Sequence, residues 1–166
     1  MLFWHLPSKF GTELKAKEVA VRTIRNILEN REIFSLSPTM SAEEAARYMA
    51  ERNVGAAIVL ERGQLVGLLS ERDILTKVAA TGRDPKKTRV SEIMAENLVM
   101  VEADRTYEDC LALMKRNGIR HLPVVDSGRL LGLVSLRDLL QVDVSEKEDE
   151  IKMMRAYIHG VPPGSQ

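Results

Sequence analysis

The stretch "GLLSERD" at Gly67–Asp73 decides the fold, because it recurs 65 residues later as "GLVSLRD" at Gly132–Asp138. The match extends upstream in the same register, where Met49 corresponds to Met114. Internal self-similarity of this kind indicates a repeat architecture and takes precedence over naming single elements. We therefore interpret the chain as two copies of one unit.

Each unit has the same pattern of predicted elements. A short extended run precedes a helix with a capping box, two apolar strands follow around a glycine turn, and a second helix begins at the serine of the heptapeptide. The predicted segments are Ile33–Leu36, Ser41–Asn53, Ala56–Leu60, Leu65–Leu69 and Ser70 onward, and then Leu98–Val101, Thr106–Gly118, Leu122–Val125, Leu130–Val134 and Ser135 onward. The order is β-α-β-β-α, twice. A unit of about 60 residues buries too little surface alone, so we predict an α/β (α+β) fold in which two units pack sheet to sheet with pseudo-twofold symmetry.

The domain organisation follows from this repeat. We predict an N-terminal arm with the start of a helix over residues 1–20, repeat 1 over 21–81, a linker over 82–87, repeat 2 over 88–141, and a C-terminal amphipathic helix and tail over 142–166. The flanking helices are predicted at Thr12–Glu29 and Val144–His159. Both carry apolar stripes at helical spacing, which are typical of intramolecular packing or of a homodimer interface.

Composition excludes several classes of protein. The 166 residues carry a formal net charge of zero, so no global field favours nucleic acid or an anionic membrane. No apolar run approaches the roughly 20 residues that cross a bilayer. The single cysteine, Cys110, excludes an internal disulfide framework and is interpreted as a small buried residue. We expect a cytoplasmic protein.

The heptapeptide itself has two interpretations. Ser70-x-x-Asp73 is a capping box, and Gly67 could simply permit a close backbone approach. Alternatively, a helix N-terminus with a serine hydroxyl suits a phosphate, and the carboxylate one turn later can accept hydrogen bonds from the two hydroxyls of a ribose. The spacing alone leaves both open.

The repeat resembles the cystathionine β-synthase (CBS) domain family, whose pattern G-h-x-[S/T]-x-x-D matches both heptapeptides. The stretch "NGIRHLPVVD", Asn117–Asp126, is similar to a second hallmark of that family. The resemblance covers about Val21 to Gln141, and the closing "EIKMMRAYIHG" is similar to the end of small stand-alone bacterial proteins with a CBS pair.

The resemblance implies a non-catalytic regulatory module that binds an adenosine compound: AMP, ADP, ATP, NAD(H) or, in some members, S-adenosylmethionine. Each site would take its aspartate from one repeat and most other residues from the other. The Asp73 site would combine Leu68, Ser70 and Asp73 with Leu98, Val99, Ile119, Arg120 and His121. The Asp138 site would combine Leu133, Ser135, Arg137 and Asp138 with Ile33, Phe34, Val54, Gly55 and Ala56.

The two sites differ at one pair of positions. Arg120 and His121 in the second repeat correspond to Gly55 and Ala56 in the first. Arginine brings a permanent charge, and histidine a donor that strengthens on protonation. Our hypothesis is that the Asp73 site binds a phosphate-bearing ligand more tightly. Arg72 and Arg137, which precede the aspartates, either reach phosphate or solvate the helix face.

The sequence favours no catalytic site and no catalytic cofactor. His5 and His159 have no metal-ligand partners at suitable spacing, and phosphate-binding glycine loops are absent from the sequence. The alternative function is a structural dimerisation module without a nucleotide. The family resemblance implies a homodimer, a disc of two CBS pairs, and any output would pass to an unknown effector protein in trans.

Overall fold

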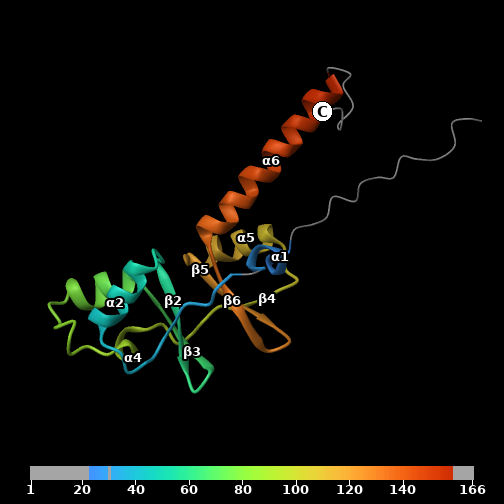
Figure 1. The fold of residues 1–166 in the computed structure, drawn as a ribbon. Coiled ribbons are helices and arrows are strands. Elements are labelled where there is room, and N and C mark those ends of the chain that lie inside the picture. The colour runs from blue at the N-terminus through green and yellow to red at the C-terminus, as the bar shows by residue number, and fades with distance from the viewer. Residues whose placement is uncertain (1–22, 30, 159–166) are drawn as a thin grey trace, which may run out of the picture.

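The computed structural model describes residues 23–29 and 31–158 and contains two three-stranded sheets (Figure 1). The first has the order β1-β2-β3, and the second has the order β4-β5-β6. In each sheet a short strand lies parallel to the central strand, and the third strand is antiparallel to it. The predicted α/β fold and its duplicated units are confirmed.

The first sheet consists of β1 (Ser35–Leu36), β2 (Ala56–Glu61) and β3 (Gln64–Ser70). Helix α2 (Ala42–Glu51) begins at the predicted capping box. After β3 the chain continues as α3 (Glu71–Ile74) and a π-helical turn, η1 (Leu75–Ala79). The second helix of this repeat is therefore short and changes its hydrogen-bond pattern after one turn.

The second sheet consists of β4 (Val101–Glu102), β5 (His121–Asp126) and β6 (Arg129–Ser135). Helix α5 (Tyr107–Asn117) ends at Gly118, which has a left-handed backbone conformation, with φ 63°. Helix α6 (Leu136–Ile158) follows β6 directly and projects from the body of the molecule (Figure 1). The predicted boundary at residue 141 is not a structural break, because α6 runs through it.

The two central hairpins turn in the same way. Arg62 and Gly63 both have positive φ angles, and so do Ser127 and Gly128. A two-residue turn with two positive φ angles matches the twist of antiparallel strands, and it explains the glycine in each turn.

Two short helices exchange partners between the repeats. Helix α1 (Ile24–Leu28) opens the first repeat, yet Ile24 and Leu28 are buried in the core of the second, beside α5 (Figure 1). Helix α4 (Val90–Ile93) opens the second repeat but is buried in the core of the first. Each core is thus completed by a helix from outside its own repeat, which ties the two units together.

The remaining face of each sheet is also covered. Ile58 on β2 is fully buried, although its neighbours Ala57 and Val59 form the helix-covered core. Successive strand residues point to opposite faces, so Ile58 lies on the face away from α2. Burial on both faces explains why the central strands are continuously apolar.

One flanking helix was predicted too long. Thr23 has an extended backbone, with φ −80° and ψ 161°, and α1 begins only at Ile24. Thr23 forms a β-bridge with Thr106, and this pairing excludes a continuous helix through position 23. The predicted arm and helix up to residue 22 lie outside the described residues, as do the side chains of Tyr157 and Ile158, which belong to the apolar stripe predicted for the C-terminal helix.

Candidate functional site

Both heptapeptides form the capping box that their spacing predicts. The Ser70 N–H donates to Asp73 Oδ2 at 3.0 Å, and the Asp73 N–H donates to Ser70 Oγ at 3.4 Å. The corresponding distances for Ser135 and Asp138 are 2.8 and 3.2 Å. In each cap the serine holds the Oδ2 atom of the aspartate, and the second carboxylate oxygen, Oδ1, takes no part in the cap.

The two free oxygens have different partners. Asp73 Oδ1 pairs with Lys77 Nζ at 2.9 Å, one turn further along the chain. Asp138 Oδ1 pairs with Arg31 at 2.6 Å, a residue of the other repeat. Burial opposes ionisation of both aspartates, but hydrogen bonds from the serine and from the basic partner outweigh it and lower the pKa of each carboxyl. Both carboxylates are therefore ionised acceptors at neutral pH.

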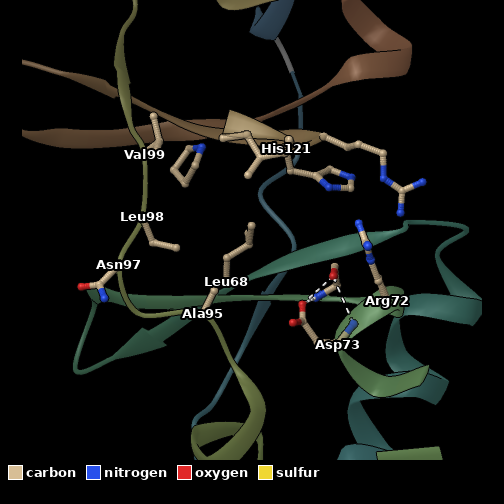
Figure 2. A pocket seen from close by; sticks show the side chains of 13 residues that line it. Leu68, Arg72, Asp73, Ala95, Asn97, Leu98, Val99 and His121 are labelled. Carbon is tan, nitrogen blue, oxygen red and sulfur yellow. Dashed lines mark hydrogen bonds between the residues drawn. The ribbon is translucent and has the colours of Figure 1, made fainter. Parts of the chain in front are cut away.

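A cavity of about 250 Å³ opens beside Asp73 between the two repeats. Figure 2 shows Leu68, Arg72 and Asp73 on the first-sheet side of this space, with Val99 and His121 on the side of the second sheet. All eight residues predicted for the Asp73 site line it: Leu68, Ser70, Asp73, Leu98, Val99, Ile119, Arg120 and His121. We call this space the Asp73 cleft.

Five further residues line the Asp73 cleft: Arg72, Ala95, Asn97, Gly118 and Pro123. The sequence had left open whether Arg72 faces a ligand or solvent, and the structure places it at the cavity. Asn97 directly precedes the predicted site residue Leu98, and Pro123 lies two residues after His121 in the second hallmark stretch. Their position in the sequence, beside predicted site residues, could therefore have indicated that they line the cleft. Ala95 lines the cleft because its backbone pairs with Leu68 across the repeats, a contact with no sequence pattern.

The second predicted set is arranged differently. The Arg31–Asp138 ion pair brings to Asp138 the part of the chain that is followed, two and three residues later, by the predicted Ile33 and Phe34. The predicted residues Val54, Gly55 and Ala56 lie at the start of β2, and Leu133, Ser135 and Arg137 lie at the end of β6 and the start of α6. A second cavity, of about 470 Å³, is lined by Leu65, Val66, Glu96, Asn97, Leu98, Val99 and Met100. Neither of these two cavities reaches the Asp138 set.

The pKa of His121 depends on charged residues of both repeats. Burial lowers its pKa, and the charge of Arg120 lowers it further, whereas Asp138 and Glu71 act in the opposite direction. The net shift is downward, so the imidazole is neutral at pH 7 and becomes a second cation of the Asp73 cleft only when a proton is bound.

The glycines of the heptapeptides are required by packing. A Cβ atom on Gly67 would lie 2.5 Å from Met94 Sδ and 3.1 Å from the Ala95 carbonyl oxygen. A Cβ on Gly132 would lie 3.3 Å from a methyl group of Leu28. Close approach by the exchanged helices α4 and α1, and by the chain that follows α4, thus explains both glycines.

The described residues contain no cluster of three or more His, Cys, Asp or Glu side chains arranged to hold a metal ion. Cys110 is buried, as predicted, and burial is the main reason that its pKa rises to about 11. A thiol in that state is a poor nucleophile. Over the same part of the chain, no helix combines the length and apolar character needed to span a bilayer.

Comparisons with known proteins identify the repeat. The sequence profile of the CBS domain matches residues 23–80 and 90–145. The CBS domain-containing protein YhcV of Bacillus subtilis is 43% identical over 108 residues, which cover 65% of this chain and 76% of that protein. An uncharacterized protein of Methanopyrus kandleri is 35% identical over 127 residues, covering 74% of this chain and 65% of its own length.

Solved structures agree with the profile. A CBS-domain protein from Burkholderia ambifaria, described as a candidate for signal transduction, has a TM-score of 0.72 at 34% identity and covers 75% of this chain and 95% of its own. A hexameric CBS-CP12 protein from bloom-forming cyanobacteria has a TM-score of 0.69 at 32% identity, covering 85% of this chain and 82% of its own. Two matched segments, an exchanged pair of helices and paired heptapeptides in register lead to one conclusion: this chain belongs to the CBS domain family, as a tandem pair.

Proposed function

We propose that this protein is a non-catalytic regulatory module that binds an adenosine nucleotide, such as AMP, ADP, ATP or NAD(H), in the Asp73 cleft. The observation that carries the proposal is the cavity itself, which combines Ser70 and Asp73 of the first repeat with Arg120 and His121 of the second. These groups offer acceptors for a sugar and donors for a phosphate within one space.

The geometry suggests how such a ligand would lie. Asp73 Oδ1 is the oxygen that remains outside the cap, so it would accept from the ribose hydroxyls in competition with Lys77. The volume of about 250 Å³ lies slightly below the usual range for ligand sites, which begins at about 300 Å³. The base and sugar would fill it, and the phosphate would lie at the rim beside the exposed Arg72 and Arg120.

Regulation follows from the position of the cleft. A ligand that contacts both repeats stabilises the mutual arrangement it fits best, and it shifts the population only as far as its affinities for two arrangements differ. Helix α6 leaves the second repeat directly after Ser135 and would carry such a shift to an effector protein in trans.

Calorimetry on Asp73→Ala and Asp138→Ala tests the proposal, with AMP, ATP and NADH as probes. We expect Asp73→Ala to weaken binding of the preferred nucleotide about tenfold or more, since a hydrogen bond to a charged group contributes roughly 1.5–3 kcal/mol. Asp138→Ala is the matched control and should have a smaller effect. Equal losses would contradict the inequality of the sites, and no binding by the unaltered protein would contradict nucleotide binding.

A second candidate function, a dimerisation module without a nucleotide, is favoured by α6. Leu140, Val144, Ile151 and Met154 lie on one face of this helix and are 47% to 56% exposed. Together with Lys147, these residues follow the alternating spacing of about four and three residues that is typical of a coiled-coil interface. A second copy of this chain would cover that face and form a homodimer.

Light scattering after size-exclusion chromatography tests the dimer. A variant with Ile151→Glu and Met154→Glu should halve the molecular mass of the particle, because charge on the stripe opposes association. Met153→Glu is the matched control, because Met153 is equally exposed but lies on the opposite face. An unchanged mass for the double variant would exclude α6 as the interface.

A further inference from the structure

The two heptapeptide aspartates are paired with cations of different origin. Lys77 Nζ lies 2.9 Å from Asp73 Oδ1 and belongs to the same helical segment, one turn further along the chain. Arg31 Nη1 lies 2.6 Å from Asp138 Oδ1 and belongs to the other repeat. Since the serine of each cap already holds Oδ2, both oxygens of each carboxylate are engaged.

The repeat register explains this difference. An offset of 65 residues places the uncharged Val142 at the position of Lys77, so α6 has no cation that could pair locally with its aspartate. The same offset places Glu96 at the position of Arg31. An acidic side chain cannot pair with a carboxylate, so only the second site receives its cation from across the repeats.

Arg31 is positioned by α1. Its N–H donates to the Leu28 carbonyl at 3.0 Å, and Leu28 is buried in the core of the second repeat. Ile33 and Phe34, which are predicted to face a ligand at Asp138, follow two and three residues later. The guanidinium therefore joins the aspartate to the segment that would supply the opposite wall of that site.

Lys77 lies beside its cavity and does not line it. Its Nζ also donates to the Ile93 carbonyl at 2.7 Å, and Lys77 is not one of the residues that line the Asp73 cleft. Neither the Asp73 cleft nor the second cavity is lined by Arg31 or Asp138. A ligand can therefore enter beside Asp73 without passing its cation, whereas neither of these cavities leads to Asp138.

An acidic side chain further separates the two sites. Gly55 stands at the position of Arg120 in the repeat register, and a Cβ atom on Gly55 would lie 3.4 Å from Glu71 Oε1. The Asp138 site thus has a carboxylate beside the position that carries an arginine at the Asp73 cleft. Like charges repel, so this environment favours a guanidinium over a phosphate.

We infer that Arg31 is an internal occupant of the Asp138 site: its guanidinium takes the carboxylate oxygen that a ribose would need, so the chain binds one adenosine compound, at Asp73, instead of two. Arginine is suited to this role because it is always charged and matches the geometry of a carboxylate. The inference rests on the proposed function for its ligand, but the ion pair can be tested without one.

The first experiment measures the ion pair by NMR titration of the Asp138 carboxyl. Burial raises the pKa of this group, and the hydrogen bonds from Ser135 and Arg31 lower it. We therefore expect the pKa to rise in Arg31→Ala. Arg25→Ala is the matched control, because Arg25 lies in α1 and forms a similar pair, at 2.7 Å, with Asp126. An unchanged Asp138 pKa in Arg31→Ala would overturn the inference.

The second experiment counts binding sites by calorimetry with adenosine, which has no phosphate for Glu71 to repel. The unaltered protein and Arg25→Ala should bind one adenosine per chain, and Arg31→Ala should bind two. The second site should gain about tenfold or more in affinity, because a charge-assisted hydrogen bond no longer has to be broken. Adding Asp138→Ala to Arg31→Ala should return the count to one. Circular dichroism and thermal unfolding establish that each variant is folded.

The outcomes separate this inference from the proposed function. One site in Arg31→Ala, or two in the unaltered protein, overturns the role of Arg31 while binding at Asp73 stands. If none of these proteins binds adenosine or AMP, the proposed function and the blocking role fail together. The pKa of Asp138 then still decides whether Arg31 occupies the carboxylate.

Discussion

At the scale of single residues, one side chain of the heptapeptide, Asp73, both caps a helix and lies at the proposed ligand site. Asp73 Oδ2 caps α3 through Ser70, while Oδ1 lies beside Lys77 at the cleft. The capping interpretation and the ligand interpretation of the sequence are therefore compatible, because the two oxygens of one carboxylate have separate partners. The capping role is observed, and the ligand role remains a proposal.

The lowered pKa of Asp73 predicts a pH-dependent stability. A carboxyl whose pKa is lower in the folded state stabilises the fold above its unfolded value of 3.8, and this contribution is lost as the pH falls through the folded value. Asp73→Asn should reduce the free energy of unfolding by about 1 kcal/mol at pH 7, the size of a lost cap. Urea denaturation should show the difference shrinking at pH 3, and a difference independent of pH would contradict the assignment.

His121 predicts a pH-dependent affinity. Its pKa is lowered by burial and by Arg120, so the free protein carries a neutral imidazole at pH 7. A bound phosphate favours the protonated form, and nucleotide binding should therefore take up a proton and strengthen as the pH falls from 7.5 to about 6. Calorimetry in two buffers of different ionisation enthalpy measures the uptake. His121→Asn is the control, and an equal uptake in that variant would assign the proton to the phosphate itself.

At the scale of elements, the last strand of each sheet is in close contact with a segment of the other repeat. The chain directly after α4 packs on β3, and α1 packs on β6. The absence of a Cβ atom leaves room for Met94 and Ala95 at Gly67, and for Leu28 at Gly132. The two contacts differ in kind, because Gly67 faces a backbone oxygen as well as a side chain, whereas Gly132 faces the end of a leucine that can shift.

This difference predicts unequal effects of alanine. Gly67→Ala should lower the free energy of unfolding by about 1–3 kcal/mol, as overpacking does when the backbone has to move. Gly132→Ala should cost less, since Leu28 can change rotamer. Urea denaturation of both variants measures the effect, and a Gly132→Ala variant that is the less stable of the two would show that the Leu28 contact is the more rigid.

At the scale of the whole molecule, the exchange of α1 and α4 makes the two repeats one folding unit. Leu28 belongs to the first repeat in the sequence but is 6% exposed in the core of the second. A repeat cut at the linker would lose a helix from its core, so neither half is self-sufficient in this arrangement.

Leu28→Ala should therefore destabilise the whole protein. We expect a loss of about 2–5 kcal/mol, the usual cost of a cavity in a core, with both sheets unfolding in a single transition. Leu75→Ala is the control, since Leu75 is 63% exposed and should have little effect. Two separate transitions, in calorimetry or in urea, would contradict the coupling of the repeats.

The sequence alone determined the repeat, the order of elements in each unit, the capping boxes and the hairpin turns, whereas the eight predicted residues that line the Asp73 cleft came from the resemblance to the CBS family. These features are local, or they follow from a motif written twice in register, so their signal is present in neighbouring letters. Arg72 could be assigned to neither alternative, because the direction of an exposed arginine depends on the surface opposite it.

Only the tertiary structure decided which core each short helix completes, that Arg31 reaches Asp138, and that Ala95 closes one side of the cleft. The helix predicted through position 23 was wrong for the same reason, because the pairing of Thr23 with Thr106 overrides its local pattern. These contacts join segments distant along the chain, and the free energy that selects them comes from burial between the repeats, which no single segment records.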